Sequence, residues 1–283
     1  MPFASHRVVS DTRLRASRSL APLLVALALS PSIAGAQTDY YNTDAGRPLA
    51  VEDALPLELR ALELQLAPVR FTRFRGATEL GFEPELALGI LPRTQVEVGI
   101  PITVATSSSA DAHGSSAVGL TVAALHALNV ETSLPAFAVG GSIAVLGGES
   151  RIAQASVKAI ATRTMPGVRV HVNAAFSVRT STNGSDEEEV TFGDELSRWL
   201  AGVAIDRTFP LSSLLIGAEL TAREPLGADR GTQWSTAAGA RYQLGPRSSL
   251  DGGVGVHLTG PERGWFVTAG AAVQLYRAWR PDR

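Results

Sequence analysis

Apolar and polar residues alternate along residues 78–104, in two segments joined by a turn at residues 92–93. Before the turn, leucine, isoleucine and phenylalanine occupy one parity, and glutamates and glycines occupy the other. After the turn, valines and isoleucines alternate with Gln95 and Glu97. A period of two is typical of a strand, because successive side chains point to opposite faces of the pleat. The pattern predicts a β-hairpin that separates an apolar medium from a polar one.

The same period recurs from residue 57 to the end of the chain and predicts an all-β protein. The alternation is clear in most segments and blurs around Ala123 and Leu125. The expected strands are residues 57–72, 77–91, 94–104, 116–128, 135–147, 152–163, 167–178, 197–208, 212–223, 232–243, 247–258 and 264–276.

The lengths of the connections favour a membrane barrel over a soluble sheet. The connections at residues 92–93, 129–134, 164–166, 209–211 and 244–246 are short, whereas those at 105–115, 179–196 and 224–231 are long. All the long connections fall on one side, as in outer-membrane barrels, whose periplasmic turns are short. We therefore expect a single antiparallel up-and-down transmembrane β-barrel of about 12 strands, with both termini in the periplasm.

The N-terminal region has the pattern of a secretory signal peptide. Four arginines precede an apolar block at residues 20–36, which ends in Ala34-Gly35-Ala36 before Gln37. We expect cleavage after residue 36, an irregular periplasmic leader over residues 37–56, the barrel over residues 57–279 and a short tail over residues 280–283. The expected location is the bacterial outer membrane.

Composition agrees with this class of protein. Only 18% of the residues are charged, below the roughly 25% of an average soluble protein. Residues 1–36 hold four arginines and one aspartate, so the remaining chain has 21 basic and 26 acidic residues and a net charge of −5. A mildly acidic chain without a basic tract makes nucleic acid an unexpected partner. Cysteine is absent, so an exported chain of this size must hold together without disulfides.

Charged residues on the polar parity predict the lining of the barrel. Acidic residues gather on the first three expected strands and basic residues stand across from them, so the lumen is expected to carry a transverse field. Glu83, Glu85, Lys158, His171 and Asn173 are the expected constriction. The alternative is that these charges pair with one another and fill a narrow lumen. The full set of candidates is Glu63, Glu79, Glu83, Glu85, Glu97, Lys158, Arg169, His171, Asn173, Arg198, Glu219, Arg223 and Arg241.

Aromatic residues predict the two membrane–water interfaces, where Trp and Tyr gather in such barrels. The expected girdle is Trp199, Trp234, Trp265 and Phe71 at the outer interface, and Phe137, Tyr242, Tyr276 and Trp279 at the inner one. Phe71 belongs to it only if the parity of the first strand shifts at Pro68. The expected partners are outer-membrane lipid and the barrel-assembly machinery, which we expect to recognise Tyr276 or Trp279.

Two prolines conflict with the strand pattern, because a closed barrel has no edge where a missing N–H is harmless. We expect a bulge at Pro84 and a position near the outer rim for Pro101.

No catalytic, metal or cofactor pattern stands out. The histidines of the mature chain, at positions 113, 126, 171 and 257, lack an accompanying local signature. No metal-spaced cluster and no phosphate-binding loop occurs in the sequence. We therefore expect neither enzymatic activity nor a cofactor.

The leader and first hairpin, through ALELQLAPVRF and EPELALGILPRTQVEVGIPI, resemble the outer-membrane transporters of the phenol-degradation (meta-pathway) type. The resemblance covers roughly residues 40–104 and implies passage of small compounds, aromatic ones among them; it carries over no functional residue. The resulting hypothesis is a barrel that passes small solutes passively. A plugged structural or surface-interaction barrel, a soluble periplasmic β-sandwich and a barrel enzyme are the alternatives.

Overall fold

The computed structural model describes residues 43–44, 47–74, 77–107, 115–146, 152–179, 197–225, 231–260 and 263–275. The expected signal peptide, the tail, Tyr276, Trp279 and most of the long connections lie outside the described residues. The strands are β1 (Leu62–Phe74), β2 (Ala77–Leu91), β3 (Thr94–Gly99), β4 (Ile102–Ser107), β5 (Ser115–Ala127), β6 (Ala136–Leu146), β7 (Ile152–Met165), β8 (Val168–Arg179), β9 (Ser197–Phe209), β10 (Leu214–Pro225), β11 (Gln233–Gly245), β12 (Ser248–His257) and β13 (Gly264–Leu275).

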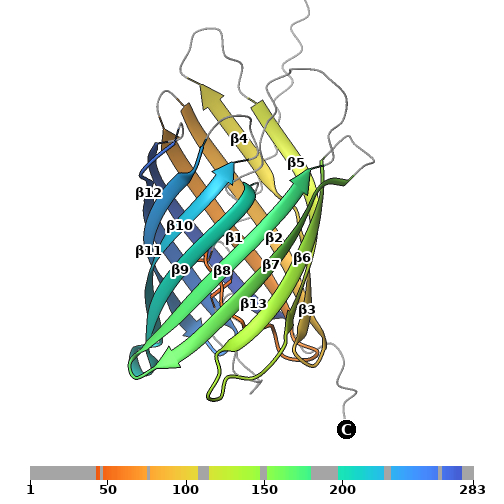
Figure 1. Cartoon of the computed structure of the whole chain (residues 1–283), viewed down its shortest axis with the longest axis vertical. Coiled ribbons are helices and arrows are strands. Elements are labelled where there is room, and N and C mark those ends of the chain that lie inside the picture. Colours follow the sequence, from red (N-terminus) through yellow and green to blue (C-terminus); the bar gives the residue numbers. More distant parts are fainter. Residues whose placement is uncertain are drawn as a thin grey trace, which may run out of the picture. The chain divides into compact units, whose positions relative to one another are not determined.

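These strands form a closed antiparallel barrel (Figure 1). Each strand pairs with its neighbours in sequence, and β1 pairs with both β2 and β13, which closes the ring. β3 and β4 are two halves of one strand, since both pair with β2 on one side and β5 on the other in an unbroken register. The barrel thus has 12 strands, as the periodicity predicted. In the described part of the chain no helix is long and apolar enough to cross a membrane.

The two faces of the wall differ as the alternation requires. The outer face is apolar and exposed, as at Leu80, Ile100 and Val139. The inner face carries the buried polar residues, among them Gln65, His171 and Asp251. An apolar belt around a polar interior suits a barrel with lipid outside.

Two irregularities lie side by side in the wall. On β1, Ala67 and Pro68 face one residue of each neighbouring strand, so this bulge adds one residue and reverses the parity beyond it. The expected bulge at Pro84 therefore sits on the neighbouring strand. Pro101 separates β3 from β4 opposite Glu83, near the middle of β2, so its expected place at the outer rim was wrong. The proline interrupts the strand because it has no N–H to donate.

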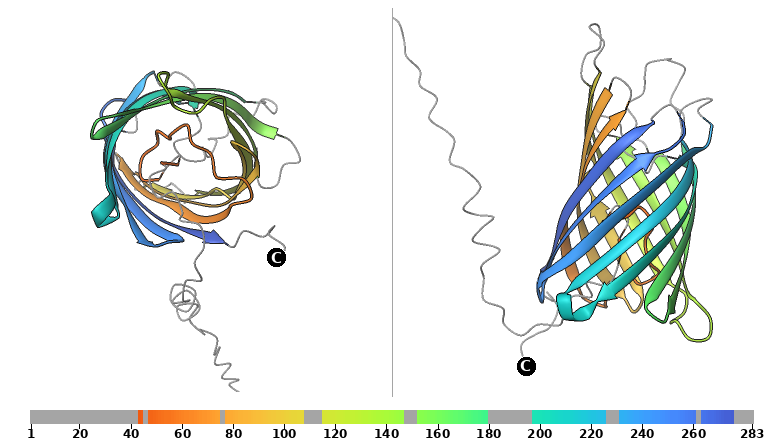
Figure 2. Two further views of the ribbon diagram at one scale, coloured as in Figure 1. Left: turned by 90° about the horizontal axis from the view of Figure 1, so that it is seen from below. Right: turned by 90° about the vertical axis from the view of Figure 1, so that its left-hand side faces the viewer.

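The segment before β1 is irregular, as expected, but it lies inside the barrel and not beyond its inner mouth. Figure 2 shows it, coloured orange, curving within the ring of strands. Leu49, Val51 and Ala54 are fully buried there. The first strand consequently starts at Leu62, later than residue 57, because residues 57–61 belong to this internal segment. We refer to the described residues of 43–61 as the inner strap.

Candidate functional site

The inner strap follows the inner wall through the half of the barrel nearest the short turns. Its contacts run from β12 and β11 past β10, β9, β8 and β7 to β3 and β2. The strap therefore makes almost a full circuit before the chain turns into β1.

Arg47 anchors the first end of the strap. Its side chain is 1% exposed, and its Nε donates to Asp251 Oδ2 at 3.2 Å. The same guanidinium lies 3.5 Å from carboxylate oxygens of both Asp44 and Glu63. Arg241 donates to the Arg47 carbonyl at 2.8 Å and to Asp44 at 3.3 Å. Two cations thus stand among three carboxylates, so each buried charge has a partner of opposite sign, as burial requires.

Glycines on the wall make room for the next strap residues. A Cβ on Gly239 would lie 2.6 Å from Pro48 Cβ, and one on Gly202 would lie 2.6 Å from Val51 Cγ2. Both separations are closer than real Cβ contacts allow. Gly253 and Gly217 relate to Pro48 and Leu49 in the same way. The wall therefore has recesses that match the strap, and a larger residue there would displace the strap unless the facing strap residue changed with it.

Polar side chains of the wall hold the middle of the strap through its backbone. Glu219 accepts the Val51 N–H at 2.8 Å. The Asn173 amide, oriented by its hydrogen bonds, donates to the Glu52 carbonyl at 2.9 Å and accepts from the Glu52 N–H at 3.0 Å. Lys158 Nζ lies 2.5 Å from Glu52 Oε1. Backbone groups that no strand ladder pairs are therefore satisfied by wall side chains, as buried backbone groups must be.

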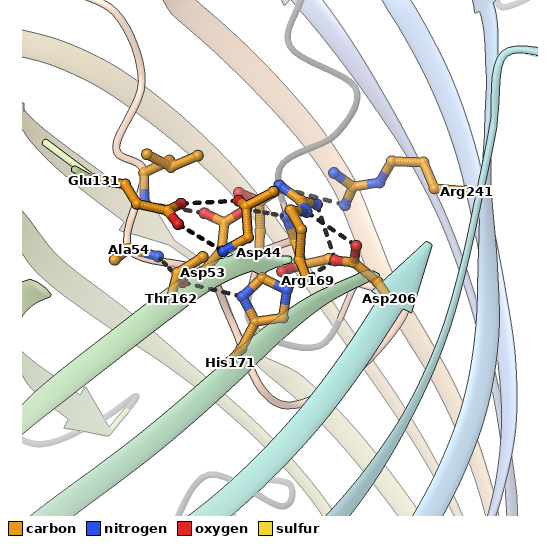
Figure 3. A network of polar contacts seen from close by, with 12 residues as sticks. Asp44, Asp53, Ala54, Glu131, Thr162, Arg169, His171, Asp206 and Arg241 are labelled. Carbon is orange, nitrogen blue, oxygen red and sulfur yellow. Dashed lines mark hydrogen bonds and ion pairs between the residues drawn. The ribbon is translucent and has the colours of Figure 1, made fainter. Parts of the chain in front are cut away.

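Asp53 reaches the basic side of the wall. Its carboxylate accepts the N–H groups of Thr43 and Leu55, both at 3.0 Å, and lies 3.6 Å from Arg169 Nη1. Arg169 also donates two hydrogen bonds of 2.9 Å to Asp206 (Figure 3). A bidentate pair of this kind fixes the orientation of the guanidinium.

Thr162, His171 and Asp206 form a chain with the outline of a catalytic triad. His171 Nδ1 lies 3.0 Å from Thr162 Oγ1, and His171 Nε2 lies 2.8 Å from Asp206 Oδ2. However, Thr162 Oγ1 accepts the Ala54 N–H at 2.9 Å, and both Thr162 and His171 are almost fully buried under the strap (Figure 3). A nucleophile needs an oxygen free to approach a substrate. These three side chains therefore hold the strap in place, and Thr162 Oγ1 is engaged with the backbone of the strap.

The last residues of the strap join the wall backbone directly. Leu57 N–H donates to Gln95 at 2.6 Å, and Arg60 N–H donates to the Gly89 carbonyl at 2.7 Å. Gly89 N–H in turn donates to Ala61 at 2.9 Å. This end continues the pairing of β1 with β2.

The structure gives many of the predicted lumen residues a partner that the sequence did not reveal. Glu63, Lys158, Arg169, Asn173, Glu219 and Arg241 contact the strap, and His171 does so through Thr162. Their role as a constriction stays a prediction. Asp206, Asp251 and Gln95 were missed; each lies on an inward parity, which was the available signal.

The remaining candidates are placed in the wall as follows. Glu83 and Glu85 face Gly99 across neighbouring strands, and Glu97 accepts from Gln95. Glu79 is half-buried, and Arg223 donates to Gln233 at 2.6 Å. Arg198 departs from expectation: it is exposed at the rim and pairs with Glu224 at 3.1 Å, because the register shifts at the start of β9.

Aromatic side chains occupy the outer face at both ends of the wall. Phe71 points outward beyond the β1 bulge, with its ring centroid 5.6 Å from that of Trp265. Trp234 is exposed, and the Trp199 indole donates to Glu224 at 2.8 Å. Phe137 and Tyr242 are exposed near the short turns. In the described residues no group of three or more metal-ligating side chains is placed to hold an ion.

Comparisons with known proteins identify the fold. No family model and no curated protein matches the sequence. An outer membrane channel from Pseudomonas putida F1 is 15% identical, with a TM-score of 0.52 over 79% of this chain and 98% of that one. The KdgM porin is 12% identical, with a TM-score of 0.46 over 76% of this chain and 99% of that one. The CymD monoaromatic hydrocarbon channel is 8% identical, with a TM-score of 0.45 over 78% and 90%. The closed antiparallel wall and the likeness to the Pseudomonas putida channel give the chain the fold of an outer-membrane β-barrel.

Proposed function

We propose that the chain is an outer-membrane channel for the passive passage of small solutes, with a cross-section narrowed by the inner strap. The observation that carries the proposal is the contrast between the two faces of the closed wall. The outer face is apolar, whereas Glu79, Glu83 and Glu85 project half-buried carboxylates from the inner face of β2. Carboxylates facing a barrel interior are typical of a lumen that holds water and ions.

The same features support a proposal for the solute class. A lumen lined by carboxylates and narrowed by a strap admits small molecules and excludes large ones. The resemblance of residues 40–104 to transporters of the phenol-degradation type extends the proposal to small aromatic compounds. Neither feature calls for a cofactor or an energy source.

A second candidate is a plugged barrel with a structural or surface-interaction role. The observation that favours it is the depth at which the strap is docked, with Arg47, Leu49 and Val51 at or below 1% exposure. A segment held this tightly could close the lumen permanently.

Planar-bilayer recording of the purified full chain separates the two candidates. A channel gives unitary conductance steps, and Glu83→Gln changes their size, because it removes a charge from the lumen. A plugged barrel gives no steps. The protein should first show the mobility shift between unboiled and boiled gel samples that a closed barrel gives; a heat-invariant band would contradict the barrel itself.

A further inference from the structure

The inner strap is attached to the wall in two different ways. Residues 57–61 exchange backbone hydrogen bonds with Gly89 and so extend a barrel ladder. Among the described residues of 43–54, the one isolated β-bridge joins two residues of the strap itself, Asp44 and Arg47, and not the strap to the wall. This part is held by side chains of the wall and by apolar contacts.

The ring of strands closes without help from residues 43–54. Each strand is paired on both sides by other strands, including β1 with β2 and β13. Departure of residues 43–54 would break ion pairs and side-chain hydrogen bonds but no bond between strands. The wall can therefore keep its shape whether or not this part is docked.

A short exposed stretch joins the two parts of the strap. Leu55 is 38% exposed and Leu59 is 42% exposed, whereas Ala54 and Ala61 are buried. Pro56 lies within this stretch and has no N–H to pair with the wall. Residues 55–56 are thus the place where the docked part can swing while residues 57–61 stay attached.

The charges of the strap and of the wall determine the position in which residues 43–54 dock. Arg47 meets the carboxylates of Glu63 and Asp251, while Glu52 and Asp53 meet Lys158 and Arg169. Reversal of the strap would bring like charges together, which costs free energy. The docked position is therefore unique in direction and in register.

We propose that the described residues of 43–54 form a gate, which detaches reversibly from the wall about residues 55–56 and is docked in the resting state. The Glu52–Lys158 pair and the ion pairs around Arg47 hold the gate in the docked state. The inference rests on the proposed channel function, because a gate needs a passage to close.

A reversible disulfide tests the gate in the full chain. The Cβ of residue 202 would lie 2.6 Å from Val51 Cγ2, so the two Cβ atoms are within about 4.1 Å of each other once a C–C bond of about 1.5 Å is added, within reach of a disulfide. The chain has no cysteine of its own, so Val51→Cys with Gly202→Cys gives one pair without background. Each single substitution is the matched control for the effect of the new side chain.

Conductance is recorded before and after reduction of the pair. A gate gives two conductance levels, the larger one when it is detached. We expect the oxidised protein to lose this larger level and reduction to restore it, while the reductant has no effect on the single variants. Equal conductance in both states would overturn the gate and leave the channel intact. Failure of the pair to oxidise would contradict the docked contact itself.

Labelling of Lys158 provides a readout that does not depend on conductance. It is the only lysine, so peptide mapping after treatment with an acetylating reagent reports its accessibility without competing side chains. We expect slower labelling in the oxidised protein, because the disulfide keeps Glu52 paired with Lys158. A difference in labelling without conductance in either state would support release of the strap and overturn the channel. Equal labelling in both states would overturn release.

Discussion

Arg47 and Asp251 are 204 positions apart in the chain, yet the Nε of one donates to the carboxylate of the other at 3.2 Å, inside the barrel. The pair joins the segment before the first strand to the strand before the last. It therefore ties the strap to the region where the ring of strands closes.

Arg47→Ala should loosen the strap. It leaves three carboxylates with Arg241 as the one cation near them, and breaking a buried pair costs about 3–5 kcal/mol. We expect faster hydrogen exchange at the N–H groups of Val51 and Ala54, by about two orders of magnitude or more. Arg163→Ala is the control, since Arg163 pairs with Glu131 at an exposed turn. Unchanged exchange in the Arg47 variant would show that this cluster does not hold the strap.

Gly239→Ala should also displace the strap, although it changes no charge. The added methyl group would overlap Pro48, and overpacking of this kind typically costs about 1–3 kcal/mol. Limited proteolysis should then cut within residues 43–56 more rapidly than in the parent protein. Gly252→Ala is the matched control, because its Cβ would meet one wall oxygen at an ordinary 3.4 Å. Similar cleavage rates in the two variants would contradict the fit between wall and strap.

Pro101→Val should stabilise the barrel. Gly119 N–H donates to the Pro101 carbonyl at 2.9 Å, and the register on both sides places the two residues opposite each other. A residue with an N–H can return the bond to the Gly119 carbonyl, which contributes about 1 kcal/mol. The midpoint of urea unfolding in lipid vesicles should rise, with Pro92→Val in the turn as the control. A lower midpoint would show that the interruption fits a shape the wall requires.

Tryptophan fluorescence should locate the belt of the barrel in the bilayer. Trp234 and Trp265 are exposed on the outer face near the starts of β11 and β13. Lipids brominated near the headgroup should quench their emission more than lipids brominated near the chain ends, because the two indoles lie at one interface. Trp265→Phe should remove part of this quenching. Quenching by a water-soluble agent alone would place these residues outside the membrane.

The strands and their faces could be predicted from local sequence, because a period of two appears within a few residues. The first strand shows the limit: its parity reverses at Ala67-Pro68, and only a neighbouring strand reveals the extra residue. Pro101 was misplaced for the same reason, since its height in the wall depends on pairing with β2.

The site could be predicted only in part. Inward charges such as Glu63, Lys158 and Arg241 are visible in the alternation, but their partners lie on the strap, as far as 197 positions away in the case of Arg241 and Asp44. An irregular segment has no periodicity, so nothing local shows that it docks. The charges on the inward parity were the available hint, because a buried charge requires a partner.

The recesses at Gly202, Gly217, Gly239 and Gly253 make the inner wall a mould of the strap. Because each recess fits one strap residue, the two facing positions must change together. Among related chains, a larger residue at one of these wall positions should accompany a smaller residue at the facing strap position, or loss of the docked segment. The residues at these four wall positions would then indicate which related proteins keep a docked strap, even where the strap itself is too short and irregular to align.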